Sequence, residues 1–252
     1  MDAETLYQTR STAYLGRVKQ QFNRALTFSL SWIAVLLALF LMQDRWFATR
    51  PLAIQPQSID GLIGILTAPL LHGSFEHLAS NAFAILILGT IAGSLFPRAS
   101  RAALPLVWIG SGLGTWFISL GGHHIGASGV TVGLMFFLIA QGLRRRDRMS
   151  LTGLMLALFF FGGMVLSVLP QEAGVSWEYH LSGAVVGFLC GLAFAGRDER
   201  APVRLYSWDL EPEADDANAE LQLEKPQNVP VLWHRPEPRG GDNVLPFRRP
   251  DS

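Results

Sequence analysis

The residues best suited to chemistry in this chain form three short clusters that lie far apart in the sequence. The first is a serine flanked by small residues, Gly126-Ala127-Ser128-Gly129, at the start of an apolar stretch. The other two combine histidine with glycine or an amide: His72, His77 and Asn81, and His180, Gly183 and Gly187. A serine hydroxyl becomes a nucleophile when an adjacent base takes its proton. The clusters therefore predict one hydrolytic site, with Ser128 as nucleophile and His180 as general base.

The composition indicates that these clusters lie in a membrane protein. Half of the 252 residues are hydrophobic, 16% are charged, and the mean hydropathy is +0.28. A typical soluble domain carries about 25% charged residues. The basic residues are scattered at the ends of apolar segments, so we expect no nucleic-acid partner. The single cysteine, Cys190, excludes an intrachain disulfide and a cysteine-based metal site, and we expect no cofactor.

Six apolar segments are spaced along residues 26–196, and a spanning helix needs about 20 residues. They are 26–42, 75–96, 102–120, 128–143, 150–169 and 179–196. The sequence therefore predicts an all-α fold, a polytopic bundle of six transmembrane helices. Residues 1–25 form a polar N-terminal segment whose weak periodicity allows a helix at the membrane interface. Residues 197–252 hold 8 of the 14 prolines and an acidic run, so we predict a disordered cytoplasmic tail.

The distribution of basic residues predicts the orientation of the helices. The segments on the side of the N-terminus hold 13 of the lysines and arginines before residue 205, and the opposite loops hold 2. Cytoplasmic segments carry such an excess of Lys and Arg. We therefore expect a protein of the inner (plasma) membrane with both termini in the cytoplasm. The first outer loop, 43–74, carries aromatic and apolar residues and is predicted to lie partly in the membrane interface.

Three candidate site residues are predicted to lie at one depth in this membrane. Each precedes a cytoplasmic arginine by nearly the same distance in sequence: Asn81 by 17 residues, Ser128 by 16 and His180 by 17. At about 1.5 Å per residue they lie roughly 24–26 Å from the inner boundary of a hydrocarbon core about 30 Å thick. His77 lies one turn above Asn81 on the same helix face. These side chains can therefore share one layer beneath the outer surface.

The short fourth segment predicts how the site would stabilise a negative charge. If its helix begins at Ser128, residues 121–127 enter the membrane as irregular backbone. Such backbone is tolerated only where it is buried in protein or lines a water-filled cavity. The first N–H groups of a helix have no partner and favour an anion. The backbone N–H of Ser128 and the side chains of His77 and Asn81 are therefore the candidate oxyanion donors.

Glycines at one-turn spacing predict a close approach of the fourth and sixth segments. They are Gly129 and Gly133 in one segment, and Gly183, Gly187 and Gly191 in the other. Small residues at this spacing let membrane helices approach closely. The nearest carboxylates, Glu172 and Glu178, lie in or near an outer loop rather than at the depth of His180. We therefore predict a Ser–His dyad rather than a triad.

Taken together, these motifs resemble the rhomboid intramembrane serine proteases. The resemblance rests on His72-x4-His77-x3-Asn81, Gly126-Ala127-Ser128-Gly129 and His180-x2-Gly183-x3-Gly187, in that order within residues 28–196. It implies a Ser128–His180 dyad with His77 and Asn81 as oxyanion donors. It also implies supporting roles for His72, Gly126, Gly129, Gly183 and Gly187. The expected partners are transmembrane protein substrates, cleaved near the outer face of the lipid bilayer.

The chain also departs from the family pattern, and alternatives accompany the resemblance. Many bacterial rhomboids have a tyrosine four residues after the serine, stacked on the catalytic histidine, and here that position is Val132. The alternative function is a catalytically weak rhomboid-like protein that binds and retains membrane clients. A transporter would carry charged residues in mid-helix, and none of the six segments does. His72 and His77 lack the third ligand of a metal site. The sequence predicts neither the substrate nor the oligomeric state.

Overall fold

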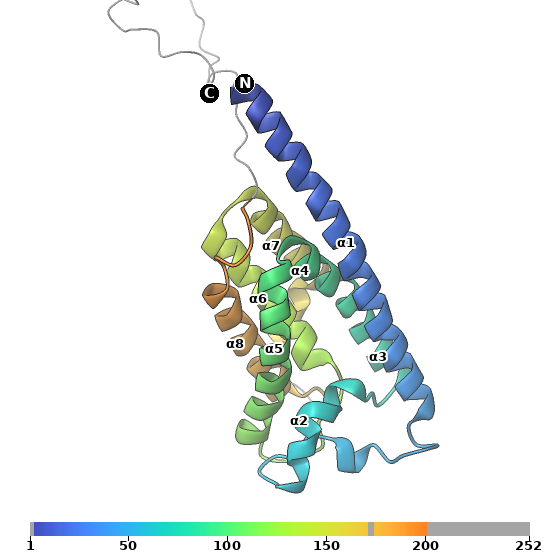
Figure 1. Cartoon of the computed structure of the whole chain (residues 1–252). Coiled ribbons are helices and arrows are strands. Elements are labelled where there is room, and N and C mark those ends of the chain that lie inside the picture. Colours follow the sequence, from blue (N-terminus) through green and yellow to red (C-terminus); the bar gives the residue numbers. More distant parts are fainter. Residues whose placement is uncertain (1–2, 171–173, 201–252) are drawn as a thin grey trace, which may run out of the picture. The chain divides into compact units, whose positions relative to one another are not determined.

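The computed structural model describes residues 3–170 and 174–200, and these residues form helices and no β-strand beyond two isolated bridges. The α-helices are α1 (Ala3–Met42), α2 (Gly64–Thr67), α3 (Phe75–Ala84), α4 (Thr90–Leu95), α5 (Pro97–Ile118), α6 (Ser128–Arg145), α7 (Arg148–Phe161) and α8 (Trp177–Ala193). The fold is therefore all-α, as the sequence predicts (Figure 1). The predicted disordered tail beyond residue 200, and Glu172, lie outside the described residues.

The first helix is longer than its apolar segment. α1 runs without a break from Ala3 to Met42, so residues 3–25 are helical but belong to the same helix as the first apolar segment (Figure 1). Their position at the membrane interface stays a prediction. Hydropathy marks the part of a helix that lipid surrounds and does not mark where its hydrogen bonds end. The polar half contains no proline, and its Gln, Lys and Arg residues are good helix formers.

The second predicted segment forms one continuous helical rod, Phe75–Leu95. It consists of α3, a π-helical turn (Ile85–Gly89) and α4. The rod begins after Ser74, whose side-chain oxygen accepts a hydrogen bond from the backbone N–H of His77 at 3.2 Å. A serine cap of this kind satisfies one of the donors left free at a helix start. The cap therefore fixes where the helix that carries His77 and Asn81 begins.

The remaining helices begin and end within about five residues of their predicted segments, if α7 is counted together with the 3₁₀ helix that follows it. α5 begins at Pro97, a residue favoured in the first turn because it has no N–H to leave unpaired. α7 begins at Arg148 because the carboxylate of Asp147 accepts a hydrogen bond from the Ser150 N–H. A 3₁₀ helix, Gly162–Val168, extends α7. α6 begins at Ser128, as predicted.

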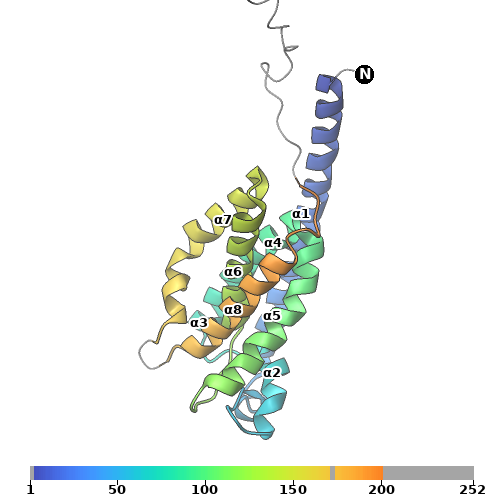
Figure 2. The same ribbon diagram turned by 90° about the vertical axis from the view of Figure 1, so that its left-hand side faces the viewer.

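Three of these rods are long and apolar enough to cross a membrane: Ser11–Met42, Phe75–Leu95 and Arg148–Val168. α5, α6 and α8 contain 22, 18 and 17 residues. α6 lies between α5, α7 and α8, and Figure 2 shows it beside α7 and α8. A helix enclosed in this way does not need an apolar face all round. The chain is therefore a helical membrane protein, and the crossing of the membrane by all six segments stays a prediction.

The first loop is folded rather than extended. Besides α2 it contains three 3₁₀ helices: Arg50–Leu52, Asp60–Ile63 and Ala68–Leu70. Its backbone accepts hydrogen bonds from the indoles of Trp108 and Trp116 on α5, at 3.2 and 2.9 Å. α2 and its neighbours occupy one end of the helices in both views (Figures 1 and 2). The loop therefore forms a fixed wall beside the segment that leads into α6.

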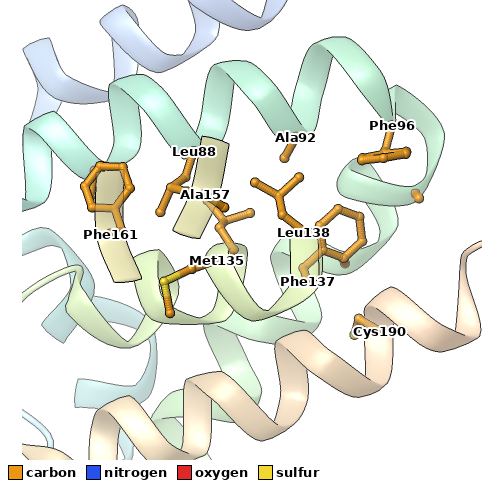
Figure 3. Close-up of a cluster of buried hydrophobic side chains, with 13 residues drawn as sticks. Leu88, Ala92, Phe96, Met135, Phe137, Leu138, Ala157, Phe161 and Cys190 are labelled. Atoms are coloured by element: carbon orange, nitrogen blue, oxygen red, sulfur yellow. The ribbon is translucent and has the colours of Figure 1, made fainter. Parts of the chain in front are cut away.

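The glycine stripes of α6 and α8 bring the two helices into backbone contact, as predicted. A Cβ atom at Gly183 would meet the carbonyl oxygen of Gly129, and one at Gly187 would meet that of Gly133. Beyond these contacts, a buried apolar cluster joins α6 to α4, α7 and α8. Figure 3 shows this cluster, with Leu88, Phe96, Met135, Leu138, Phe161 and Cys190 among its members. The cluster holds the middle of α6, residues 134–138, in place. The glycines set the distance between α6 and α8.

A buried arginine closes the end of α6 that lies away from Ser128. The Arg145 guanidinium bonds the Asp147 carboxylate at 3.0 Å and the backbone carbonyls of Ala195 and Asp198 at 2.9 Å each. Burial alone would raise the pKa of Asp147, but hydrogen bonds from Ser150 and the charge of Arg145 lower it overall. A buried charge is tolerated when it is paired and hydrogen-bonded in this way. Arg145 thereby ties the ends of α6, α7 and α8 together.

Candidate active site

Ser128 is the first residue of α6, and its surroundings follow from the glycines on either side. Gly126 has a φ of +113°, a conformation that favours glycine, and it turns the chain into the helix. The Gly126 N–H donates to the Ala68 carbonyl of the first loop at 2.9 Å. No backbone hydrogen bond uses the N–H of Ser128 or Gly129 in the described part of the chain. Two donors at a helix N-terminus therefore lie beside the half-buried serine.

The second cluster meets this turn from α3. The ring of His77 lies against Gly126, where a Cβ atom would meet its Cε1 and Nε2 atoms. Asn81 is buried, and its side-chain amide donates to the His77 carbonyl at 3.1 Å. The His72 ring packs edge-on against that of His77, with centroids 5.1 Å apart. The structure thus brings His77 to the serine turn and stacks His72 behind it.

His180 lies in the first turn of α8, three residues before the glycine that touches Gly129. Its Nδ1 atom lies 3.2 Å from the backbone carbonyl oxygen of Ser167. A carbonyl oxygen only accepts, so Nδ1 carries the proton of the neutral ring and Nε2 is left as the proton acceptor. A backbone carbonyl therefore takes the orienting place that a carboxylate holds in a triad. Sequence reasoning could not find this partner, because Ser167 acts through its backbone.

The three clusters converge, although the dyad hydrogen bond is not formed. Gly183, three residues after His180, touches Gly129, and the His77 ring touches Gly126. Among the described residues no hydrogen bond joins the Ser128 hydroxyl to the His180 ring. Catalytic hydrogen bonds are often long without substrate and shorten when it binds. Val132 is fully buried in α6 and provides no ring at the position where the family tyrosine is expected.

A second polar network, of His124, Ser119, Ser176 and Glu178, fixes the segment before Ser128. His124 contacts Ser119 Oγ through Nε2 at 3.0 Å and Ser176 Oγ through Nδ1. Ser119 also donates to Glu178 at 3.2 Å, so this carboxylate serves the loop rather than His180. The backbone of His124 exchanges two 3.0 Å hydrogen bonds with Ile54. The serine turn is therefore pinned both to the first loop and to the start of α8.

His72 and His124, which precede α3 and α6, predict that the protein loses stability in acid. Burial lowers the pKa of His72 to about 4, helped by the charge of His77, and burial also lowers the pKa of His124. A histidine whose folded pKa lies below its unfolded value of about 6.5 stabilises the fold above that value and loses this contribution as pH falls. We expect the thermal midpoint in detergent to fall between pH 6.5 and 4.

The variant His72→Leu separates this effect from general acid damage. The His72 ring is fully buried, and neither ring nitrogen has a partner among the described residues. An apolar residue of similar size therefore removes the titration without breaking a hydrogen bond. Its thermal midpoint should vary less with pH than that of the wild type. Equal acid sensitivity in the two proteins would show that His72 does not contribute.

Comparison with known proteins identifies the family of this chain. The Rhomboid domain family matches residues 60–197, more than half of the chain. Uncharacterized proteins of Mycobacterium bovis and Mycobacterium tuberculosis are each 39% identical over 161 residues, covering 59% of this chain and 65% of the relative. An uncharacterized protein of Mycobacterium leprae is 34% identical over 150 residues, or 56% and 59%. The matched region thus spans less than two thirds of these relatives. Because the family model matches more than half of the chain, the chain belongs to the rhomboid family.

Proposed function

We propose that this protein is an intramembrane serine endopeptidase with a Ser128–His180 dyad. The Ser128 hydroxyl attacks the peptide carbonyl while Nε2 of His180 takes its proton. The proton then passes to the leaving amine, and water releases the acyl group from the serine in the second half of the reaction. The observation that carries the proposal is the hydrogen bond from His180 Nδ1 to the Ser167 carbonyl, which leaves Nε2 free to act as the base.

The oxyanion site of this proposal combines the start of α6 with two side chains of α3. The unpaired N–H of Ser128 and the rings and amides of α3 supply the donors, with His77 against Gly126 and Asn81 one turn below it. Donors that are fixed in advance stabilise the charge of the tetrahedral intermediate without reorganising. Gly126, Gly129, Gly183 and Gly187 act by letting these groups approach, and His72 acts by packing behind His77.

The proposed substrates are transmembrane proteins cleaved near the outer face of the membrane. The serine turn lies at the end of the helices that carries the first loop and opposite the Arg145 cluster. The excess of basic residues on the Arg145 side supports a cytoplasmic location for that end, and hence for both termini. We propose that the protein lies in the inner (plasma) membrane. Retention of clients without cleavage is the alternative, and the labelling test below separates the two.

A serine-reactive fluorophosphonate tests the proposed nucleophile without any knowledge of the substrate. An activated serine oxygen displaces fluoride from phosphorus, whereas an unactivated hydroxyl does not react. We expect the full chain in detergent to be labelled at Ser128, as identified by peptide mass. Ser128→Ala and His180→Ala should each remain unlabelled while folded. Labelling at another serine, or equal labelling of His180→Ala, would contradict the proposed dyad.

Removal of an oxyanion donor should slow cleavage without abolishing it. One such donor is typically worth about 10²–10³ in rate. We therefore expect Asn81→Ala and His77→Ala each to lower kcat for a single-span substrate by this order, with a smaller change in KM. His123→Ala is the matched control, because this exposed histidine precedes the same turn and contacts Arg50 instead. Wild-type rates in both α3 variants would remove α3 from the mechanism.

A further inference from the structure

A cavity of about 450 Å³ lies between α1, α4 and α5, away from the candidate active site. Arg24 of α1 and Arg98 and Arg101 of α5 line it, together with apolar residues, and no acidic side chain does. A second cavity of about 340 Å³ shares Phe28, Trp32 and Leu104 with the first. It continues along α1 and α5 to Val35, Leu70 and Trp108. The two cavities form one strip that is basic at one end and apolar along the rest.

The basic end of this strip carries charge that the described residues do not neutralise. No salt bridge in this part of the chain involves Arg24, Arg98 or Arg101, and all three side chains are exposed. The carboxylate of Asp198 accepts the backbone N–H groups of Arg98 and Ala99 at 2.9 Å each, so it meets the start of α5 rather than a guanidinium group. The guanidinium group of Arg101 donates to the Pro97 carbonyl through Nε and keeps its other donors. An anionic ligand would meet three guanidinium groups from two helices.

The length of the strip matches one leaflet of a bilayer. Arg24 lies 18 residues before the end of α1, or roughly 27 Å at 1.5 Å per residue, close to the hydrocarbon thickness of about 30 Å. Arg24 therefore lies at the headgroup level. Val35 lies 11 residues further along α1, roughly 16 Å deeper, which is about half of that thickness. The apolar part of the strip therefore has the depth of one acyl chain.

Two buried donors lie between the basic and apolar parts. The hydroxyl of Ser29 and the indole N–H of Trp32 line the first cavity, and neither has a hydrogen-bond partner among the described residues. Trp32 also stacks on Trp108, with ring centroids 5.5 Å apart, and forms an aromatic wall. Both polar atoms are covered by the protein, so this part of the strip offers a ligand the apolar wall of Trp32 and Trp108.

We propose that this strip binds one anionic phospholipid, whose phosphate lies among Arg24, Arg98 and Arg101 and one of whose two acyl chains follows α1 to Val35. Basic pockets between transmembrane helices on the cytoplasmic side suit such headgroups. The lipid connects α1 to α5, and it lies in the cytoplasmic leaflet if the proposed orientation holds. A ligand that binds only the folded state also stabilises it.

Native mass spectrometry of the full chain, with phosphatidylglycerol and phosphatidylcholine in competition, tests this proposal. Each arginine near a headgroup contributes roughly fivefold in affinity, and three contribute on the order of 100-fold. We expect one retained phosphatidylglycerol, lost in the Arg24→Gln/Arg98→Gln/Arg101→Gln variant. The control Arg144→Gln/Arg146→Gln/Arg148→Gln removes three exposed arginines from the end of α6 and the start of α7, outside the strip, and should keep the lipid.

Several results would show that the strip does not bind an anionic phospholipid. Equal retention of the two lipids by the wild type, or equal loss in the two triple variants, would overturn the proposal. Inorganic phosphate is the third arm: if it raises the thermal midpoint as much as phosphatidylglycerol does, the site binds a free anion rather than a lipid. If the first triple variant does not fold, Arg24→Gln alone should reduce retention about fivefold. None of these measurements uses proteolysis, so their failure leaves the proposed protease function standing.

Discussion

Ser128→Ala and His180→Ala are each expected to abolish cleavage of a single-span substrate, and the double variant should be no slower than either. The serine provides the attacking oxygen and the histidine takes its proton, so neither group is useful alone. In a serine protease with such a unit, loss of the nucleophile or the base costs about 10⁶-fold in kcat, and the losses do not add. Turnover in proteoliposomes measures the effect. The thermal midpoint of Ser128→Ala should change little, because no hydrogen bond joins its hydroxyl to His180 among the described residues. His180→Ala also loses the hydrogen bond to the Ser167 carbonyl, so its turnover is compared at a temperature where the variant is folded.

Two controls make this result specific. Ser31→Ala changes an exposed serine of α1 and should keep wild-type turnover. In a Cys190→Ala background, cysteines placed at positions 128 and 180 should form a disulfide under mild oxidation, because a disulfide needs Cβ atoms about 3.5–4.5 Å apart. Cleavage by Ser128→Ala, with no crosslink between positions 128 and 180 in a folded protein, would exclude the dyad. Binding of clients without cleavage by the wild type would favour the alternative function.

The parts of the fold that sequence predicts best are those encoded by local spacing. The start of α6 at Ser128 and the irregular backbone before it follow from residues a few positions apart. The stripes that meet at Gly129 and Gly183 are each marked by glycines one turn apart within a single helix. The stop of the apolar pattern also locates most helix ends. It fails at α1, because a polar helix that continues beyond the lipid has no change of composition at its own start.

The parts that sequence does not predict depend on backbone atoms and on pairs distant in the chain. The hydrogen-bond acceptor for His180 is the backbone carbonyl of residue 167, and any amino acid at that position would provide the same group. His124 and Ser176 meet across 52 positions, so neither marks the other. Arg145 lies between two exposed arginines in the sequence, and only packing distinguishes the buried one from its neighbours.

The second large effect is expected where Gly187 of α8 touches Gly133 of α6. These glycines lie more than one helical turn after His180 and Ser128. A Cβ atom at Gly187 would lie 2.6 Å from the carbonyl carbon of Gly133 and 2.7 Å from its Cα. Real Cβ contacts do not reach such distances, and the obstructing atoms belong to the backbone of a helix that the apolar cluster holds from the other side. A flexible side chain could move aside, whereas here α6 itself must shift.

Gly187→Ala should therefore destabilise the protein by roughly 1–3 kcal/mol, and Gly187→Leu should prevent α8 from packing against α6. For a chain of this size we expect the alanine variant to melt roughly 2–12 °C lower. Gly16→Ala is the matched control, because Gly16 lies within α1 with nothing within 4 Å of its would-be Cβ atom. Alanine at that position favours the helix and should leave the midpoint unchanged or raise it. Thermal unfolding in detergent, together with fluorophosphonate labelling of Ser128, measures both consequences. If Gly187→Leu melts and labels like the wild type, the backbone contact of α6 and α8 does not hold the serine in place.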